Sequence, residues 1–381
     1  MSLVRAFDLW WKEIENGSRC DQLSLPYVRA KVGLGSSPLP DLRHRHGHRS
    51  SDRPTAGSPH VHVPPAKSTI VNPYGGASYA VRKETLLAAQ QNQRIDVVVC
   101  VHNALDHVRA CLDAVQKTLG EHHRLIVVDD GSNLQTQMEL KRRADQDVRI
   151  TLHRNESAMG YTRACNIALK ETTGNLVVLL NSDTIVSGDW LLKLADAAFT
   201  SPGAGIVGPL SNAGDLQSIP NNANTVDNTA INPLPPGLDV ADMDQRCEEW
   251  TIGTSLPRVS MINGFCFAIR REVIEAIGLM DELAFPAGYG EETDYCCRAS
   301  DAGFGLVVAT HTYVYHAKSQ SYPAAARIAL QAQGGKYLSR RYGRERISRA
   351  LASANENPIL RRIRLLSGNL YDELGSRDEK T

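Results

Sequence analysis

Residues 176–184 read LVVLLNSDT: five consecutive apolar residues, then a polar cluster with one carboxylate, Asp183. A run of this length is too short for an isolated helix and is typical of a strand that is buried on both faces. In open α/β sheets, ligands bind at the carboxyl ends of the strands. Asp183 is therefore a candidate site residue, but it fits equally well as the N-cap of a helix that starts near Gly188.

Other apolar runs in the same half of the chain repeat this pattern. Runs at 95–101, 125–128 and 148–152 predict three more buried strands, and segments with helical periodicity separate them. Strands that alternate with helices predict a parallel sheet with right-handed crossovers. The polar residues that end three of these four strands are His102, Asn103, Asp129, Asp130 and Asn181–Asp183. Since the carboxyl ends of parallel strands meet at one edge of a sheet, these side chains predict a site there.

Motifs that are missing from the sequence exclude several classes of protein. No G-x-G-x-x-G follows the first strand, which argues against a dinucleotide-binding Rossmann domain. No G-x-x-x-x-G-K-[ST] occurs, which argues against a P-loop NTPase. The chain has 42 basic and 42 acidic residues, so its net charge gives no indication of a nucleic-acid partner, and we expect none.

Cysteine usage and hydropathy bear on localisation. The eight cysteines form no C-x-x-C pair and several lie in apolar runs, which is typical of reduced thiols in a cytosolic protein. No run approaches the roughly 18 apolar residues that span a bilayer, and acidic residues interrupt the N-terminus where a signal peptide would be apolar. We expect a cytoplasmic protein, with peripheral contact at the inner face of the membrane as an open alternative.

Composition divides the chain into four parts. Residues 1–35 begin with an amphipathic pattern that predicts a short helical segment, docked on protein or on a membrane surface, and they resemble the tail of a neighbouring module. Residues 36–93 are rich in Ser, Pro, Arg and His and predict a largely disordered linker. Residues 94–322 hold the alternating strands and helices. Residues 323–381 predict basic helices, whose charges face either solvent or acidic phospholipid.

A set of motifs between residues 94 and 322 resembles glycosyltransferase family 2. In order, the matching pieces are VVVCVHN, LIVVDDGS, NESAMGYTRACNIAL, VVLLNSDT, INGFCFAIRREV and GYGEETDYCCRASDAGF. The resemblance is to the bacterial glycan and rhamnosyltransferase members of the family. It implies an α/β protein with the GT-A fold: a mainly parallel central sheet flanked by helices, here with a C-terminal helical extension.

The resemblance also implies an activity. Such an enzyme is inverting and metal-dependent, and it moves a sugar from a nucleoside-diphosphate sugar to a hydroxyl of a glycan or lipid-linked acceptor. We therefore expect a hexosyl- or deoxyhexosyltransferase of cell-surface polysaccharide or glycan synthesis. Two alternatives remain open: a module that binds nucleotide-sugar or glycan without turnover, and a sugar-phosphate nucleotidyltransferase, although the chain lacks the Gly-rich loop typical of the latter.

Five residues are implied as contacts of the donor nucleotide by their positions in these motifs. Asp129 or Asp130 would accept a hydrogen bond from the nucleotide base. His102 would lie against the base, where the family often has an aromatic residue. Arg163 and Asn166 would contact the nucleotide or its phosphates.

The family's metal site maps onto the stretch at residues 176–184. Asn181–Asp183 occupies the position of the Asp-x-Asp motif that holds Mn²⁺ or Mg²⁺ on the sugar-nucleotide diphosphate. Asn181 replaces the first acid, so Asp183 would be the main charged ligand. His316 resembles the family's late metal ligand and would join Asp183. The alternative is a buried histidine bonded to backbone.

The general base is expected among three acids that open a helix near residue 291. Acids are common in a first helical turn because they complement the helix dipole, so their presence alone does not show catalysis. The family's base is the second acid of this cluster, which makes Glu292 the first choice and Asp294 the alternative. Glu291 would orient its neighbours. Residues 211–258 form either filler or a loop that shapes the acceptor pocket.

Overall fold

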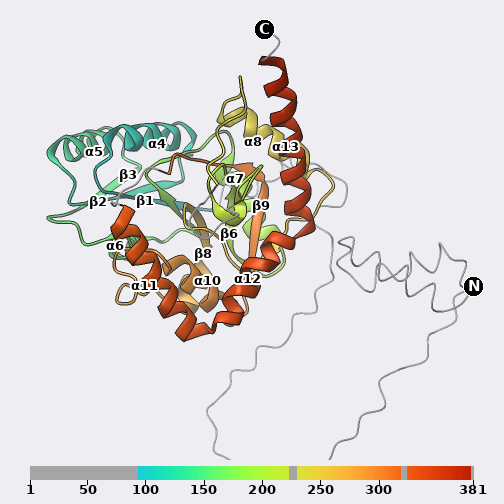
Figure 1. Cartoon of the computed structure of the whole chain (residues 1–381). Coiled ribbons are helices and arrows are strands. Elements are labelled where there is room, and N and C mark those ends of the chain that lie inside the picture. The colour runs from blue at the N-terminus through green and yellow to red at the C-terminus, as the bar shows by residue number, and fades with distance from the viewer. Residues whose placement is uncertain (1–92, 223–229, 319–323, 379–381) are drawn as a thin grey trace, which may run out of the picture. The chain divides into compact units, whose positions relative to one another are not determined.

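A computed structural model describes residues 93–222, 230–318 and 324–378 of the chain. Within them, an eight-stranded mixed sheet has helices on both faces (Figure 1). The predicted α/β fold, with a mainly parallel central sheet flanked by helices and a C-terminal helical extension, is confirmed. The predictions made for residues 1–35 and for the linker up to residue 92 lie outside the described residues.

The sheet is parallel on one side and mixed on the other. Its strands, in spatial order, are β3 (Ile150–Asn155), β2 (Arg124–Asp130), β1 (Ile95–Val101), β4 (Leu176–Asn181), β8 (Cys266–Arg270), β6 (Ala204–Leu210), β9 (Gly305–Tyr313) and β7 (Arg258–Val259). The first four strands are parallel, β8 is antiparallel to both of its neighbours, and β6 and β9 are parallel. The apolar runs thus predicted the strands of the N-terminal half, but nothing in them predicted the reversal at β8.

Alternate residues of the strands point to two separate cores. On β1, Val97 and Val99 join one core while Val98 joins the other, as expected for side chains that alternate across a sheet. The first core is covered by α4 (Leu105–Thr118), α5 (Leu134–Gln146) and α7 (Trp190–Thr200). The second is covered by α6 (Tyr161–Glu171), α8 (Val240–Thr251), α9 (Arg271–Ile277) and α10 (Glu291–Asp301).

Chain segments that are distant in sequence meet at the carboxyl edge of β1, β2 and β4. Because β8 runs antiparallel to β4, with Leu180 opposite Cys266, the residues just before β8 reach this same edge. There the Asn181 N–H donates to the Phe265 carbonyl across 2.9 Å. A second, two-stranded sheet of β5 (Thr184–Ile185) and β10 (Tyr315–His316) pairs Thr184 with His316. This pairing brings His316 beside the end of β4.

Three helices form the C-terminal extension: α11 (Ala324–Tyr342), α12 (Arg344–Glu356) and α13 (Pro358–Asp378). Leu360 and Ile363 of α13 are buried in the second core. The Arg364 guanidinium donates to the carbonyls of Ser218 and Leu216, at 3.3 and 2.6 Å. Burial lowers the pKa of Arg364 to about 10. The extension therefore packs on the sheet domain, and part of its basic charge is used there.

Helix α11 approaches the loop before α10 so closely that only glycine fits at one position. A Cβ added at Gly334 would collide with the carbonyl oxygen of Tyr289, whereas a Cβ at Gly335 would have no heavy atom within 4 Å. The ring of Phe285 packs edge-on against that of Tyr337, with the ring centroids 5.2 Å apart. These contacts dock α11 against residues 285–290.

We predict opposite effects for alanine at these adjacent glycines. Gly334→Ala should lower the free energy of unfolding by about 1–3 kcal/mol, because the backbone of the facing loop has to move. Gly335→Ala, the matched control, should raise it by up to about 1 kcal/mol, because alanine favours a helix. Urea unfolding of both variants measures this difference. Equal stability of the two variants would contradict the close approach at Gly334.

Candidate functional site

The end of β4 brings together an aspartate and a histidine, the two residues that the family resemblance implied as metal ligands. Asp183 Oδ1 lies 3.4 Å from His316 Nε2, and the two residues are 9% and 7% exposed. The Ala317 N–H donates to the Asp183 carbonyl across 2.9 Å, which ties the two chain segments together. The N-cap of α7 is Asp189, so the interpretation of Asp183 as the cap of that helix is wrong.

The hydrogen bonds of His316 determine which of its nitrogens faces Asp183. Nδ1 lies 2.9 Å from the carbonyl oxygen of Ala213. A carbonyl only accepts, so Nδ1 carries the hydrogen and, in the neutral ring, Nε2 carries the lone pair. His316 is thus a buried histidine bonded to backbone, and its other nitrogen faces the carboxylate. Two acceptors that face each other are stabilised by a cation or a proton between them.

The surroundings of His316 hold its ring in one orientation. Asn212 accepts from the His316 N–H at 2.7 Å and donates to the His316 carbonyl at 3.0 Å. The ring of Phe265 stacks on the imidazole, with the centroids 5.4 Å apart. Asn181 Nδ2 lies 3.5 Å from His316 Nε2. Within residues 93–222, 230–318 and 324–378, no three His, Cys, Asp or Glu side chains form a group that could hold a metal ion.

Glu292 lies in the first turn of α10 and faces the segment that also touches His316. A Cβ on Gly264 would lie 3.5 Å from the Glu292 Cβ, while the next residue, Phe265, stacks on the imidazole. Burial raises the pKa of Glu292, and the carboxylate of Asp215 raises it further. Residues 263–265 therefore adjoin both the candidate base and the candidate metal ligand.

The neighbouring acid, Glu291, is fully buried. Its Oε2 accepts from the Gly290 N–H at 3.0 Å, and burial raises its pKa well above the usual value, with the adjacent charge of Glu292 as the next cause. The backbone bond fixes its direction within the first turn. That Glu291 orients its neighbours stays a prediction.

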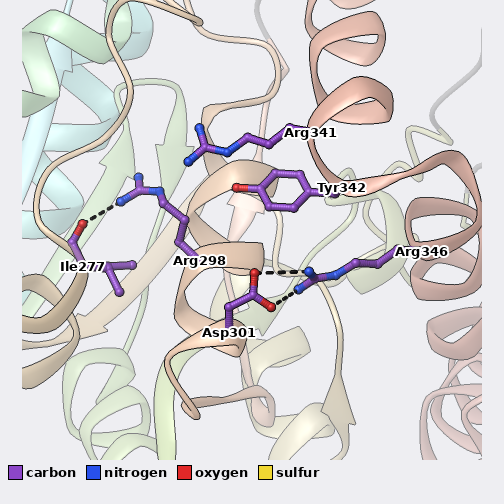
Figure 2. A pocket seen from close by; sticks show the side chains of 6 residues that line it. All are labelled: Ile277, Arg298, Asp301, Arg341, Tyr342 and Arg346. Atoms are coloured by element: carbon purple, nitrogen blue, oxygen red, sulfur yellow. Dashed lines mark hydrogen bonds and ion pairs between the residues drawn. The ribbon is translucent and has the colours of Figure 1, made fainter. Parts of the chain in front are cut away.

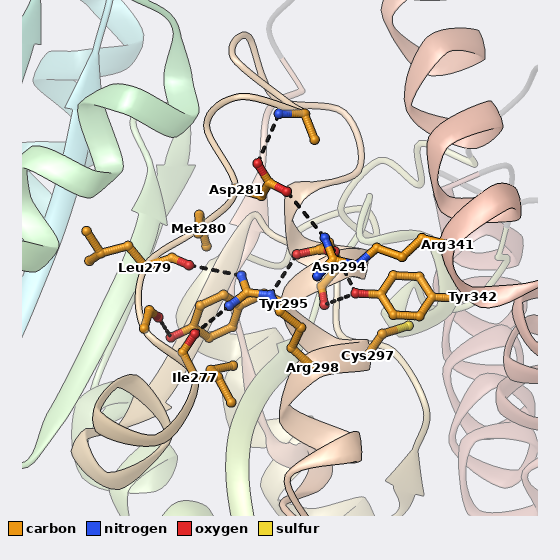
Figure 3. Close-up of polar contacts among 12 residues, drawn as sticks. Ile277, Leu279, Met280, Asp281, Asp294, Tyr295, Cys297, Arg298, Arg341 and Tyr342 are labelled. Atoms are coloured by element: carbon orange, nitrogen blue, oxygen red, sulfur yellow. Dashed lines mark hydrogen bonds and ion pairs between the residues drawn. The ribbon is translucent and has the colours of Figure 1, made fainter.

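Asp294 faces the C-terminal helices (Figure 3). It is 0% exposed; its Oδ2 accepts from Arg298 Nε at 2.8 Å and its Oδ1 from the Tyr342 hydroxyl at 2.6 Å. Arg341 Nη1 is 3.3 Å from Oδ1 and 3.3 Å from a carboxylate oxygen of Asp281. With both oxygens occupied, Asp294 gains no support as the alternative base. It joins α10 to α11.

A hollow of about 510 Å³ lies beside this joint, and arginines line it (Figure 2). Each of these arginines has an acidic partner: Arg346 binds both oxygens of Asp301, at 3.1 and 2.7 Å, and the other two share Asp294. Arg298 also donates to the carbonyls of Ile277 and Leu279. The charges here hold helices together and leave no excess of positive charge for a ligand.

Both carboxylates at the end of β2 are engaged within the protein. Asp129 accepts from the Ser132 N–H at 2.9 Å and forms a close ion pair with Arg154. Asp130 accepts from the N–H groups of Met159 and Gly160, at 2.8 Å each, and from Asn155. Asp129 lines a hollow of about 350 Å³ with residues of α5 and β3. Contact of either aspartate with the base of a donor nucleotide stays a prediction.

The other predicted nucleotide contacts lie in different surroundings. His102 is exposed at the end of β1, and its Nδ1 lies 2.8 Å from the Asp130 carbonyl. Arg163, on α6, is half-buried and has no ion pair within the described residues. The buried amide of Asn166 donates to the Met280 carbonyl and to Glu282 and accepts from the Met280 N–H. Its groups are satisfied by this loop, so the structure lends no support to a nucleotide contact at Asn166.

Sequence reasoning missed a short segment that completes the site. Residues 211–218 place Asn212 and Ala213 against His316 and Asp215 near Glu292. Asp215, at a φ of 50°, accepts from Asn263 Nδ2 at 2.6 Å. The sequence offered only a general signal, the expectation of a long loop, because Asn and Asp residues are common in turns. Part of the loop expected at residues 211–258 is helical instead: it forms α8, which has a capping box at its start.

Comparison with known proteins places this geometry in a family. The family model described as glycosyl transferase family 2 matches residues 96–278. Residues 96–278 belong to glycosyltransferase family 2. The match covers the strands from β1 to β8 and the Asp183 end of the candidate site, whereas Glu292 and His316 lie beyond it.

Individual relatives of the family 2 domain are distant. The chain is 23% identical over 238 residues to the uncharacterized protein y4gI of Sinorhizobium fredii, covering 60% of this chain and 25% of that one. It is 30% identical over 103 residues to glycosyltransferase GlyA of Streptococcus pneumoniae, covering 27% and 15%. A solved structure of GalNAc-T7 with UDP, GalNAc and Mn²⁺ is similar at a TM-score of 0.46 and 20% identity, covering 59% and 44%. The chain thus spans a quarter or less of these two curated relatives.

The raised pKa of Glu291 leads to a prediction about stability and pH. The folded protein holds this proton more tightly than the unfolded chain, so the free energy of unfolding should fall as pH rises above the unfolded pKa of about 4.3. Glu291→Gln removes this penalty and should raise the stability near neutral pH while leaving it unchanged in acid.

Urea unfolding between about pH 5 and pH 8 measures this slope. Glu275→Gln is the matched control, because Glu275 is exposed on α9 and should leave the pH dependence as it is. An identical slope in the Glu291→Gln variant and the wild type would show that Glu291 is ionised at no cost.

Proposed function

We propose that this chain is an inverting, metal-dependent glycosyltransferase that moves a hexose or deoxyhexose from a nucleoside-diphosphate sugar to an acceptor hydroxyl. The acceptor would be a glycan or a lipid-linked glycan of cell-surface polysaccharide synthesis. The family 2 match supports the class of reaction. The pairing of Asp183 with His316, 3.4 Å apart at the carboxyl edge of the sheet, is the observation that carries the proposal.

The donor set at this pair fits a divalent cation such as Mn²⁺ or Mg²⁺. Asp183 supplies a carboxylate oxygen, and the neutral ring of His316 presents the Nε2 lone pair, since its Nδ1 donates to Ala213. Hard cations complete their coordination with waters and substrate phosphates, so two protein ligands suffice when a diphosphate is present. A bound cation would stabilise the negative charge of the departing diphosphate. Asn181 is proposed to contact the phosphates of the donor.

Glu292 is proposed as the general base. It would take the proton of the acceptor hydroxyl as that oxygen forms a bond to the anomeric carbon and the bond to the diphosphate breaks. Its raised pKa, caused by burial and by Asp215, brings the carboxylate closer to the pH at which a base works best. General-base catalysis contributes roughly 10²–10⁴-fold, so positioning of the two substrates has to supply much of the remainder.

Asp294 is proposed to hold the base in position instead of replacing it. Residues 292 and 294 point about 200° apart on a helix, so they face opposite sides. Tyr342 and Arg298 hold Asp294 on one side, which fixes the rotation of the first turn of α10. With this rotation, Glu292 adjoins Gly264.

Loss of the Asp183 charge should abolish metal-dependent binding of nucleoside diphosphate. We expect Mn²⁺ with UDP or GDP to raise the melting temperature of the wild type; at 100 times the Kd the stabilisation is about 2.7 kcal/mol. Asp183→Asn should lose this shift and His316→Gln should weaken it. Ser182→Ala, the neighbouring control, should keep it. If Asp183→Asn shows the same rise in melting temperature as the wild type, the metal binds elsewhere.

Removal of the base should separate turnover from binding. Glu292→Gln keeps the size of the side chain but cannot accept the proton, so release of nucleoside diphosphate should fall roughly 10²–10⁴-fold while donor affinity stays near normal. Asp294→Asn should instead lower the free energy of unfolding by about 1–3 kcal/mol, since it disturbs a buried network.

A panel of UDP-, GDP- and dTDP-sugars, screened by thermal shift and then by diphosphate release, identifies the donor for this test. An active Glu292→Gln enzyme would move the base to another residue. Donor binding without any release in the wild type, over a range of acceptors, would contradict the transferase and favour a module that binds nucleotide-sugar without turnover.

A further inference from the structure

Helix α11 has one face on the sheet domain and an opposite face directed outward. The inward face carries Gly334 and Leu338, which pack against residues 285–290. The outward face carries residues spaced four apart, which lie nearly in line along a helix. Four of these residues lie on α11: Ile328, Ala332, Lys336 and Arg340. Together with Arg344, the first residue of α12, they are here called the outer stripe, and all five are exposed.

The cations of the outer stripe differ from the arginines of α11 and α12 that lie beside them. Arg341 and Arg346 have acidic partners in the sheet domain, and Arg349 has Glu345 one turn away on its own helix. Lys336, Arg340 and Arg344 have no ion pair within the part of the chain that the structure describes. Lys336 and Arg340 are like charges four residues apart on α11, which destabilises a helix, and Arg344 of α12 lines the same hollow. An anion that neutralises the three side chains would therefore be favourable.

The same three cations surround a surface hollow. It has a volume of about 590 Å³ and is lined by Ala332, Gly335, Lys336, Ser339, Arg340 and Arg344. Gly335 leaves its floor open, since a Cβ there would have no heavy atom within 4 Å. The lining thus offers three positive charges and a hydroxyl donor, the groups that bind phosphate. The arginine-lined hollow beside Asp294 differs because each of its arginines has an acidic partner.

We propose that the outer stripe binds a bilayer surface that contains anionic phospholipid. Lipid phosphates would lie among Lys336, Arg340 and Arg344, and Ile328 would enter the interface. Ile328 is 60% exposed, two turns before Lys336, and an apolar side chain next to basic ones is typical of interfacial helices. A soluble phosphate would not use this apolar contact. No helix in the described ranges is long and apolar enough to cross a bilayer.

Vesicle flotation of the full chain tests the proposal, and it needs no knowledge of the enzyme's substrates. The vesicles contain phosphatidylcholine alone or mixed with phosphatidylglycerol, at about 0.1 M salt, where the Debye length is about 10 Å. We expect binding to the mixed vesicles only, with loss at higher salt. The triple variant K336Q/R340Q/R344Q should bind roughly 100-fold more weakly. Ile328→Ser should give a smaller loss that persists at higher salt.

The matched control is a second triple variant, K117Q/K170Q/R361Q. These residues are also exposed, they lie on α4, α6 and α13, and their substitution changes the net charge by the same amount. The control variant should bind like the wild type, and melting temperatures should confirm that both variants fold. Equal binding by the two triple variants, or equal binding to neutral vesicles, would overturn the assignment. If the wild type binds inorganic pyrophosphate but no vesicles, the ligand of the outer stripe is a soluble anion and not a lipid.

Discussion

The hydrogen bond from His316 Nδ1 to the Ala213 carbonyl is the contact on which the candidate site depends. It places the hydrogen of the neutral ring on Nδ1 and leaves Nε2, with its lone pair, 3.4 Å from Asp183 Oδ1. Without this bond the ring could present either nitrogen, and the pair could be an ordinary hydrogen bond instead of a site for a cation. The carbonyl itself is held in place, because Asn212 binds the His316 backbone in both directions.

The two halves of the site are joined by two short chain segments. Residues 211–218 reach from His316 to the neighbourhood of Glu292, and residues 263–265 adjoin both residues from another direction. Asn263 and Asp215 bond these two segments together. Arg364 of α13 holds the carbonyls at the end of the first segment. A helix at the C-terminus thus stabilises the separation between the candidate base and the candidate metal ligand, which is a requirement for a preorganised site.

The sequence predicted what is local and missed what depends on distant pairing. The stretch 176–184 gave β4, because a short apolar run is a local pattern; His316 as partner of Asp183 came from the family resemblance. The direction of β8 has no local signature, since an apolar run pairs either way. The contacts of Asp294 with Tyr342 and of His316 with Ala213 join residues 48 and 103 positions apart. The engagement of Asp129 and Asp130 by neighbouring groups was equally invisible, because their motif looks the same with or without those bonds.

The contrast between Glu292 and Asp294 shows how one helical turn can supply two different carboxylates. Asp294 is buried, but two guanidinium groups and a hydroxyl contact its carboxylate, so neither of its oxygens is without a partner. Glu292 faces acids instead, and burial with the nearby Asp215 raises its pKa. A proton is therefore more favourable on Glu292 than on an ordinary glutamate. When two acids lie in surroundings of opposite charge, the one beside other acids is suited to take a proton and the one beside cations is suited to anchor the helix.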